Sequence, residues 1–174
     1  MATTVLTLLA DGFEEIEATS PIDLLRRADA EVTVASCSDR LEITGRSEIT
    51  LRADYLLTDI EDPLGFDLLV LPGGPAVFEL RKRPEIIDLI GNFGHTGKPI
   101  GAICAAPLLL LDAGLITPAS ACTAHGSTEG EIPQLSQNQP VVQDGQLITS
   151  RGAGTAVEFG LSLIQCLFGP EKES

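Results

Sequence analysis

Short continuous apolar runs alternate with longer amphipathic segments along the whole chain. A short run of apolar residues is typical of a strand buried on both faces, whereas apolar positions three and four apart are typical of a helix packed on one face. The first pattern predicts strands at 5–9, 31–36, 66–71 and 99–103. The second predicts helices at 13–28, 84–96, 105–113 and 156–168.

Some segments leave alternatives open. Pro21 interrupts the first helical segment, so either the helix kinks there or Ser20 caps a second helix that begins at Pro21. Residues 40–58 are irregular or form short extended pieces at 41–43 and 49–51, which could pair as a small hairpin. A short strand is expected at 122–124, and a hairpin at 141–148 that turns through Asp144-Gly145.

Strands that alternate with helices predict a mostly parallel sheet covered by helices on both faces. At 174 residues, with no internal repeat or linker, the chain is expected to form a single α/β domain over 1–174. Aromatic residues make up only 4% of the chain, so the core must consist mainly of Leu, Ile, Val and Ala.

The formal net charge of −14 limits the classes of partner that the protein is expected to bind. A field of that sign opposes phosphate neutralisation and docking on anionic membranes, which argues against bulk nucleic acid or a membrane as partner. The first nine residues lack the basic start and the long apolar run of a signal peptide, and no stretch approaches the roughly 20 apolar residues of a membrane span. We expect a cytoplasmic protein.

The four cysteines do not resemble a zinc site. Cys37, Cys104, Cys122 and Cys166 form no C-x-x-C pair, and the two histidines, His95 and His125, are not at ligand spacing. In a reducing cytosol free thiols are expected, so each cysteine is either a core residue or a nucleophile. No metal is predicted.

Cys104 has the most informative surroundings. It lies between a predicted strand and a predicted helix within Ile103-Cys104-Ala105-Ala106-Pro107, where small neighbours permit a tight turn. Amide groups at the start of a helix would stabilise a thiolate and a developing oxyanion. The alternative is a buried cysteine that serves only as a small apolar core residue.

Other polar features stay ambiguous from the residues alone. Pro72-Gly73-Gly74-Pro75 could offer backbone donors to an oxyanion or could be a plain turn. Glu14, Glu15 and Glu17 could compensate the helix dipole on a solvated face, or one of them could be a proton partner for the thiol. His125 could be a base or an ordinary loop residue.

Four segments together resemble the ThiJ/PfpI superfamily, and within it the DJ-one-like, parkinsonism-associated deglycase branch. They are Ala10-Asp11-Gly12-Phe13-Glu14-Glu15-Ile16-Glu17, Leu71-Pro72-Gly73-Gly74, Ala102-Ile103-Cys104-Ala105-Ala106-Pro107 and Thr149-Ser150-Arg151-Gly152-Ala153-Gly154-Thr155. The segments occur in the family's order and span nearly the whole chain.

The resemblance implies a flavodoxin-like three-layer sandwich, usually a homodimer, with no metal or organic cofactor. It assigns the oxidisable nucleophile to Cys104 and its protonated partner to Glu17. The oxyanion-type amides fall on Gly74 and Ala105, and His125 occupies the place of a histidine near the cysteine.

Two departures from the family pattern affect the pocket. Ala153 replaces a proline in the segment 149–155, and Gly126-Ser127-Thr128-Glu129 replaces a stretch with proline and basic residues. The rim of the pocket is therefore expected to be more acidic than in the family.

The resemblance implies a cofactor-independent enzyme that acts on methylglyoxal-type α-oxoaldehydes or on their early glycation adducts, as a glyoxalase or deglycase. A hemithioacetal on Cys104 would form, with Glu17 as proton shuttle. The alternative from another class is a redox sensor or stress-protective chaperone whose Cys104 oxidises to sulfinate. A third, flavodoxin-like interpretation is a module that binds a flavin or a nucleotide.

Overall fold

A seven-stranded sheet forms the centre of the computed structural model, which describes residues 2–169. Its strand order is β5-β2-β1-β6-β7-β9-β8. All neighbouring strands are parallel except β8 and β9, which form an antiparallel hairpin. The strands are β1 (Thr4–Leu9), β2 (Glu31–Ser36), β5 (Tyr55–Leu56), β6 (Leu68–Leu71), β7 (Ile100–Ile103), β8 (Val141–Asp144) and β9 (Leu147–Ser150).

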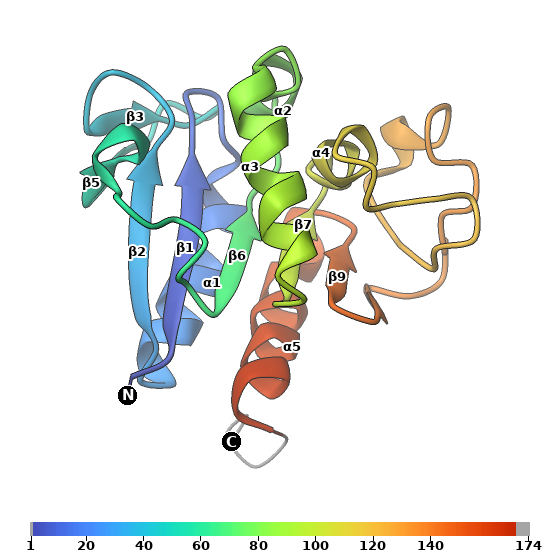
Figure 1. The fold of residues 1–174 in the computed structure, drawn as a ribbon. Coiled ribbons are helices and arrows are strands. Elements are labelled where there is room, and N and C mark those ends of the chain that lie inside the picture. Colours follow the sequence, from blue (N-terminus) through green and yellow to red (C-terminus); the bar gives the residue numbers. More distant parts are fainter. Residues whose placement is uncertain (1, 170–174) are drawn as a thin grey trace.

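Helices cover both faces of this sheet, as Figure 1 shows, with α1 and α5 together on one face and α3 on the other. The α-helices are α1 (Glu15–Arg27), α2 (Ala76–Leu80), α3 (Pro84–His95), α4 (Pro107–Asp112) and α5 (Ala156–Phe168). Three 3₁₀ turns are η1 (Leu57–Asp59), η2 (Gly126–Thr128) and η3 (Ala153–Thr155). The predicted mostly parallel sheet between two helical layers is confirmed.

The continuous apolar runs became central strands because helices bury both faces of the sheet. Residues Leu68–Leu71 of β6 and Ile100–Ile103 of β7 are buried throughout. The core is built mainly from aliphatic side chains, with Phe13, Phe93 and Phe159 as its largest members. Across residues 2–169, no helix has the length and apolar character needed to cross a membrane.

Most predicted elements are confirmed, and the structure resolves the open alternatives. The first helix continues through Pro21 as one element, so the proposed second helix start at Ser20 is wrong. The small hairpin exists as β3 (Glu42–Thr44) paired with β4 (Thr50–Arg52) in a separate two-stranded sheet. The strand expected at 122–124 is reduced to a single bridge between Cys122 and Leu135.

The strand order determines where a site can form. β1 is followed along the chain by β2 on one side and by β6 on the other, so the order reverses between β1 and β6. In open α/β sheets, ligands bind beyond the carboxyl ends of the strands at such a reversal. The loops after β1, β6 and β7 meet at this edge.

Candidate active site

The backbone of Cys104 is held in a conformation that non-glycine residues rarely adopt. Cys104 follows β7 directly and has φ 66°, in the left-handed region. Its N–H donates to Ser150 O at 2.9 Å, and its C=O accepts from His125 N at 2.8 Å. Strain of this kind costs on the order of 1–3 kcal/mol and persists only where surrounding contacts enforce it. This turn, and not the start of α4 at Pro107, therefore presents the thiol.

Glu17 reaches the same place from α1. Its side chain is only 1% exposed. Its Oε2 accepts a hydrogen bond from the backbone N–H of Gly73 at 3.1 Å, in the loop that follows β6. The carboxyl of Glu17 is also hydrogen-bonded to the Cys104 thiol. The loop after β6 thus holds the carboxyl against the sulfur.

Gly73 allows this contact because it has no side chain. A Cβ at this position would lie 2.5 Å from Glu17 Oε2 and 2.6 Å from Cys104 Cβ. It would also lie 2.8 Å from the backbone oxygen of Ile103, so the clash could not be relieved by side-chain movement alone. Glycine at position 73 is therefore a condition for the carboxyl–thiol contact.

Burial raises the pKa of both partners. The pKa of Glu17 rises to about 7, mainly because its charged form is desolvated, although the hydrogen bonds with Cys104 and Gly73 oppose the rise. The pKa of Cys104 rises to about 12, mainly through burial and then through the charge and hydrogen bond of Glu17. Because two adjacent buried anions repel, the pair holds one proton between about pH 7 and pH 12, and the order of the two pKa values places that proton mainly on the sulfur.

Two backbone amides oppose the rise in the pKa of the Cys104 thiol. The N–H groups of Gly74 and Ala105 hydrogen-bond to Cys104 and lower the pKa of its thiol. Gly74 has φ 92°, and a Cβ there would lie 2.6 Å from both Glu14 N and Gly12 O. When a proton passes from the sulfur to Glu17, these two donors stabilise the thiolate that results.

The three glutamates at the start of α1 have three different environments. Glu14 caps the helix, since its Oε2 accepts from Glu17 N at 2.8 Å. Glu15 is 6% exposed and its Oε1 accepts from Ser47 N at 2.7 Å. Dipole compensation on a solvated face is therefore the wrong interpretation for Glu15 and Glu17, and Glu17 alone contacts the thiol.

His125 borders the same space from the surface side. Its ring Nδ1 lies 2.8 Å from Ser127 Oγ, and the side chain is exposed. The ring carbon Cδ2 and Glu17 Oε1 lie 4.0 and 3.7 Å from the position that a Cβ on Gly152 would occupy. Residues 124–126 and 151–155 line a cavity of about 440 Å³ there. His125 therefore lines this cavity and is joined to Cys104 through its backbone N–H.

The remaining predicted candidates lie elsewhere. Cys37 and Cys122 are buried, Cys166 is on α5, and His95 ends α3. Between residues 2 and 169, no group of three or more His, Cys, Asp or Glu side chains is placed to hold a metal ion. Of the predicted candidates, Cys104, Glu17, Gly74 and Ala105 come together, and the backbone of His125 is bonded to that of Cys104.

Two contributors escaped the sequence reasoning. The amide of Gly73 anchors Glu17, and the side chain of Glu14 fixes the start of its helix. Glu14, three positions before Glu17, could have been identified from the sequence as the residue that caps this helix. No local sequence pattern predicts that the amide of Gly73 donates to Glu17, because 56 residues separate the two partners.

The fold is a flavodoxin-like sheet that carries a thiol, a buried acid and two amides at its carboxyl edge. This arrangement is typical of α/β proteins with a cysteine at a strand-to-helix turn. The DJ-1/PfpI family matches residues 3–166, and the chain belongs to that family. Its resemblance to the DJ-one-like branch is thereby confirmed, as is the flavodoxin-like fold.

Individual relatives support the same assignment. "Protein DJ-1 homolog B" of Arabidopsis thaliana is 37% identical over 170 residues, which cover 97% of this chain but 39% of that protein. The "Glutathione-independent glyoxalase DJR-1.2" of Caenorhabditis elegans is 34% identical over 171 residues, covering 97% of this chain and 90% of the relative. The structure titled "Toxoplasma gondii DJ-1, oxidized" superposes with a TM-score of 0.92 at 32% identity, covering 99% of this chain and 94% of that one.

The chain spans about two fifths of the length of the two Arabidopsis relatives, 39% and 43%. The activities of those longer proteins as a whole are therefore not assigned to this chain.

Proposed function

We propose that this protein is a cofactor-independent cysteine enzyme that converts methylglyoxal-type α-oxoaldehydes, or their early glycation adducts, to hydroxy acids. The observation that carries the proposal is the contact between the Cys104 thiol and the buried carboxyl of Glu17, whose pKa of about 7 suits proton exchange at neutral pH. The Caenorhabditis elegans relative is named a glutathione-independent glyoxalase, which supports the same chemistry.

The first step uses the proton that the pair shares. The proton moves from the Cys104 sulfur to the Glu17 carboxylate, and the resulting thiolate attacks the aldehyde carbon of methylglyoxal, so that a carbon–sulfur bond forms and the carbonyl π electrons move to oxygen. The amides of Gly74 and Ala105 stabilise that oxygen, and Glu17 donates its proton to it. The product is a neutral hemithioacetal, and Glu17 becomes a carboxylate.

The second stage moves a proton from one substrate carbon to the next. The Glu17 carboxylate, assisted by His125, removes the proton from the carbon that bears sulfur, which gives an enediolate and protonated Glu17. Glu17 returns a proton to the neighbouring carbon, and the hydroxyl proton of the sulfur-bearing carbon moves to the neighbouring oxygen, so a thioester of lactate forms. Water then cleaves the carbon–sulfur bond, so lactate leaves and the thiol is restored.

Lactate formation from methylglyoxal tests this function without glutathione or added metal. We expect turnover by the wild-type protein and by Cys166→Ser, which removes a thiol far from the site. Cys104→Ser should be inactive, and Glu17→Gln should lose at least a hundredfold in kcat because general acid–base groups contribute about 10²–10⁴-fold. Equal activity of the Cys104→Ser and Cys166→Ser variants would contradict the proposal.

A second function has its own support. A protonated Glu17 can donate a hydrogen bond to a sulfinate on Cys104, and the Toxoplasma gondii relative was solved in a form titled oxidized. We propose that mild peroxide adds two oxygen atoms selectively to Cys104, as in a redox sensor or a stress-protective chaperone. Intact-mass analysis tests it: oxidation that is no faster at Cys104 than at Cys166 would exclude the sensor.

We also propose that the protein works as a cytoplasmic homodimer. Ile16 on α1 and Ile49 beside β4 are large apolar side chains that are 52% and 54% exposed. Exposed apolar side chains that lie together are typical of a protein–protein contact. Burial of this region against a second copy would cover both. Sedimentation equilibrium should show a dimer for the wild type and a weakened dimer for Ile16→Glu; a monomeric wild type would refute this assembly.

A further inference from the structure

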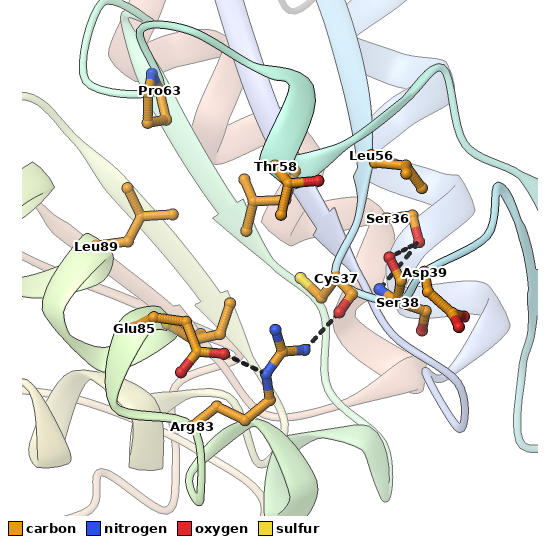
Figure 2. Close-up of a pocket in the computed structure, with 12 residues that line it drawn as sticks. Ser36, Cys37, Ser38, Asp39, Leu56, Thr58, Pro63, Arg83, Glu85 and Leu89 are labelled. Atoms are coloured by element: carbon orange, nitrogen blue, oxygen red, sulfur yellow. Dashed lines mark hydrogen bonds and ion pairs between the residues drawn. The ribbon is translucent and has the colours of Figure 1, made fainter.

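A second cavity lies apart from the carboxyl–thiol pair. It has a volume of about 560 Å³, against about 440 Å³ for the cavity beside His125, and its lining includes none of the site residues named above. It opens beyond the carboxyl end of β2, between η1 and the first turn of α3 (Figure 2). Its volume falls within the range of about 300–1,000 Å³ that is typical of small-molecule sites.

Most of the wall is apolar. Leu56, Leu57, Pro63, Ile86 and Leu89 line it, together with Cys37 at its inner end. Burial raises the pKa of the Cys37 thiol to about 12, and Cys37 lacks the hydrogen-bonded carboxyl and amides that Cys104 has, so this sulfur stays protonated and acts as a small apolar group. The cavity is therefore not a second reactive-cysteine site, and an aliphatic body would fit its walls.

One polar group is directed into this apolar space. Two nitrogens of the Arg83 guanidinium are occupied, because Nε donates to Glu85 Oε1 at 2.8 Å and Nη1 donates to the backbone oxygen of Cys37. Nη2 has no hydrogen-bond partner among the described residues. Figure 2 shows this third nitrogen pointing away from both partners, into the space below Thr58 and Leu89.

The charges around Arg83 select against an acid as the ligand. Glu85 already compensates the guanidinium, and the hydrogen bond from Arg83 lowers the pKa of Glu85, so that carboxylate stays charged. Asp39 at the rim adds a further negative charge.

We propose that this cavity binds a neutral, mainly aliphatic small molecule with one carbonyl oxygen, which accepts a hydrogen bond from Arg83 Nη2. The apolar body lies against Leu57, Ile86 and Leu89. A carbonyl oxygen can accept from an N–H of Nη2, and it brings no charge that Glu85 or Asp39 would repel. This site is independent of the chemistry at Cys104.

Two probes of equal chain length test the assignment. Isotope-labelled protein is titrated with 2-nonanone and, separately, with nonanoate, while backbone amide shifts are followed by NMR. The ketone should give saturable shifts at residues 37–39, 56–58 and 85–87 and leave residues 104–106 unshifted. Nonanoate should bind at least tenfold more weakly.

Variants separate the donor from the cavity. Arg83→Met should weaken ketone binding about tenfold or more, the value of one hydrogen bond to a charged donor. Because Arg83 also supports the loop at Cys37, Leu89→Trp provides a second variant that fills the space without removing the guanidinium and should abolish the shifts. Val157→Trp, on exposed α5 surface, should bind like wild type.

Three results would overturn the proposal. They are absence of saturable shifts with the ketone, tighter binding of nonanoate than of the ketone, and ketone shifts confined to residues near His125. Unchanged binding in a folded Leu89→Trp variant, judged by its melting temperature, would do the same.

Discussion

Replacing Glu17 by Gln should change how the Cys104 thiol titrates, and the direction follows from the contacts. In the wild type, burial and the neighbouring carboxylate raise the pKa of the thiol to about 12. The side-chain amide introduced by Glu17→Gln would still accept from Gly73 N but would carry no charge. The substitution therefore removes the repulsion between carboxylate and thiolate and leaves the two amide donors in place.

The size of the change can be worked from a carboxylate and a thiolate in hydrogen-bond contact. At about 4 Å and an effective dielectric constant of about 20, they repel by about 4 kcal/mol. That energy corresponds to about 3 pKa units. Burial, the largest cause of the rise, remains in the variant, so the pKa of Cys104 in Glu17→Gln should fall by less than this amount and stay above the ordinary value of a cysteine.

The pH dependence of alkylation by iodoacetamide, followed by intact mass, measures this difference. The wild type should show a small rise near pH 7, where the pair loses its first proton and a minor form with thiolate and protonated Glu17 becomes accessible, and a large rise toward pH 12. Glu17→Gln should show a single rise, above the ordinary cysteine value and below that of the wild type, and no step near pH 7.

Identical profiles for the two proteins would refute the reasoning. So would a wild-type profile with one inflection near the ordinary cysteine value, because it would mean that Glu17 and Cys104 titrate independently. Cys104→Ser serves as the control that removes the signal from this site and reports the background from the other three thiols.

Three further predictions follow from other contacts. Burial raises the pKa of Glu17 to about 7 in the folded state, so between pH 4.5 and 7 the folded protein holds a proton that the unfolded protein has lost. The free energy of unfolding should therefore fall by about 3 kcal/mol as the pH rises from 4.5 to 7. Denaturant titrations of Glu17→Gln should lack that fall. Gly73→Ala should reduce turnover at least tenfold by forcing Glu17 and Cys104 apart, whereas wild-type kcat in this variant would disprove the contact. Arg81→Met removes the hydrogen bonds to Asp112 and Glu131 and should lower stability by about 1–2 kcal/mol in urea unfolding, an effect that salt should diminish.

The pattern of apolar runs was sufficient to predict the layers of this fold. β2 and α5 begin and end at the predicted residues, 31–36 and 156–168. The two-residue strand β5 and the five-residue helix α2 went unpredicted, because so few residues carry no usable period. Pro21 misled the interpretation: tertiary packing of α1 against α5 keeps the helix continuous despite the missing donor.

The site was predictable only in part. The small residues around Cys104 indicated a tight turn, and the positive φ of Cys104 agrees with that interpretation. Spacing could not choose among Glu14, Glu15 and Glu17, since all three lie in one helical turn and their roles depend on distant amides at Gly73 and Ser47. The choice of Glu17 came from the family resemblance, and its contact with the thiol agrees with that choice.

The most direct test of the account is methylglyoxal turnover in D₂O, with lactate observed by proton NMR. Transfer of the substrate proton through Glu17 predicts lactate that carries solvent deuterium at the carbon next to the carboxylate, formed by wild type and not by Cys104→Ser. Lactate that keeps the original hydrogen at that carbon would contradict the shuttle and indicate a direct hydride shift. Absence of lactate with fully reduced Cys104 would contradict the enzyme itself.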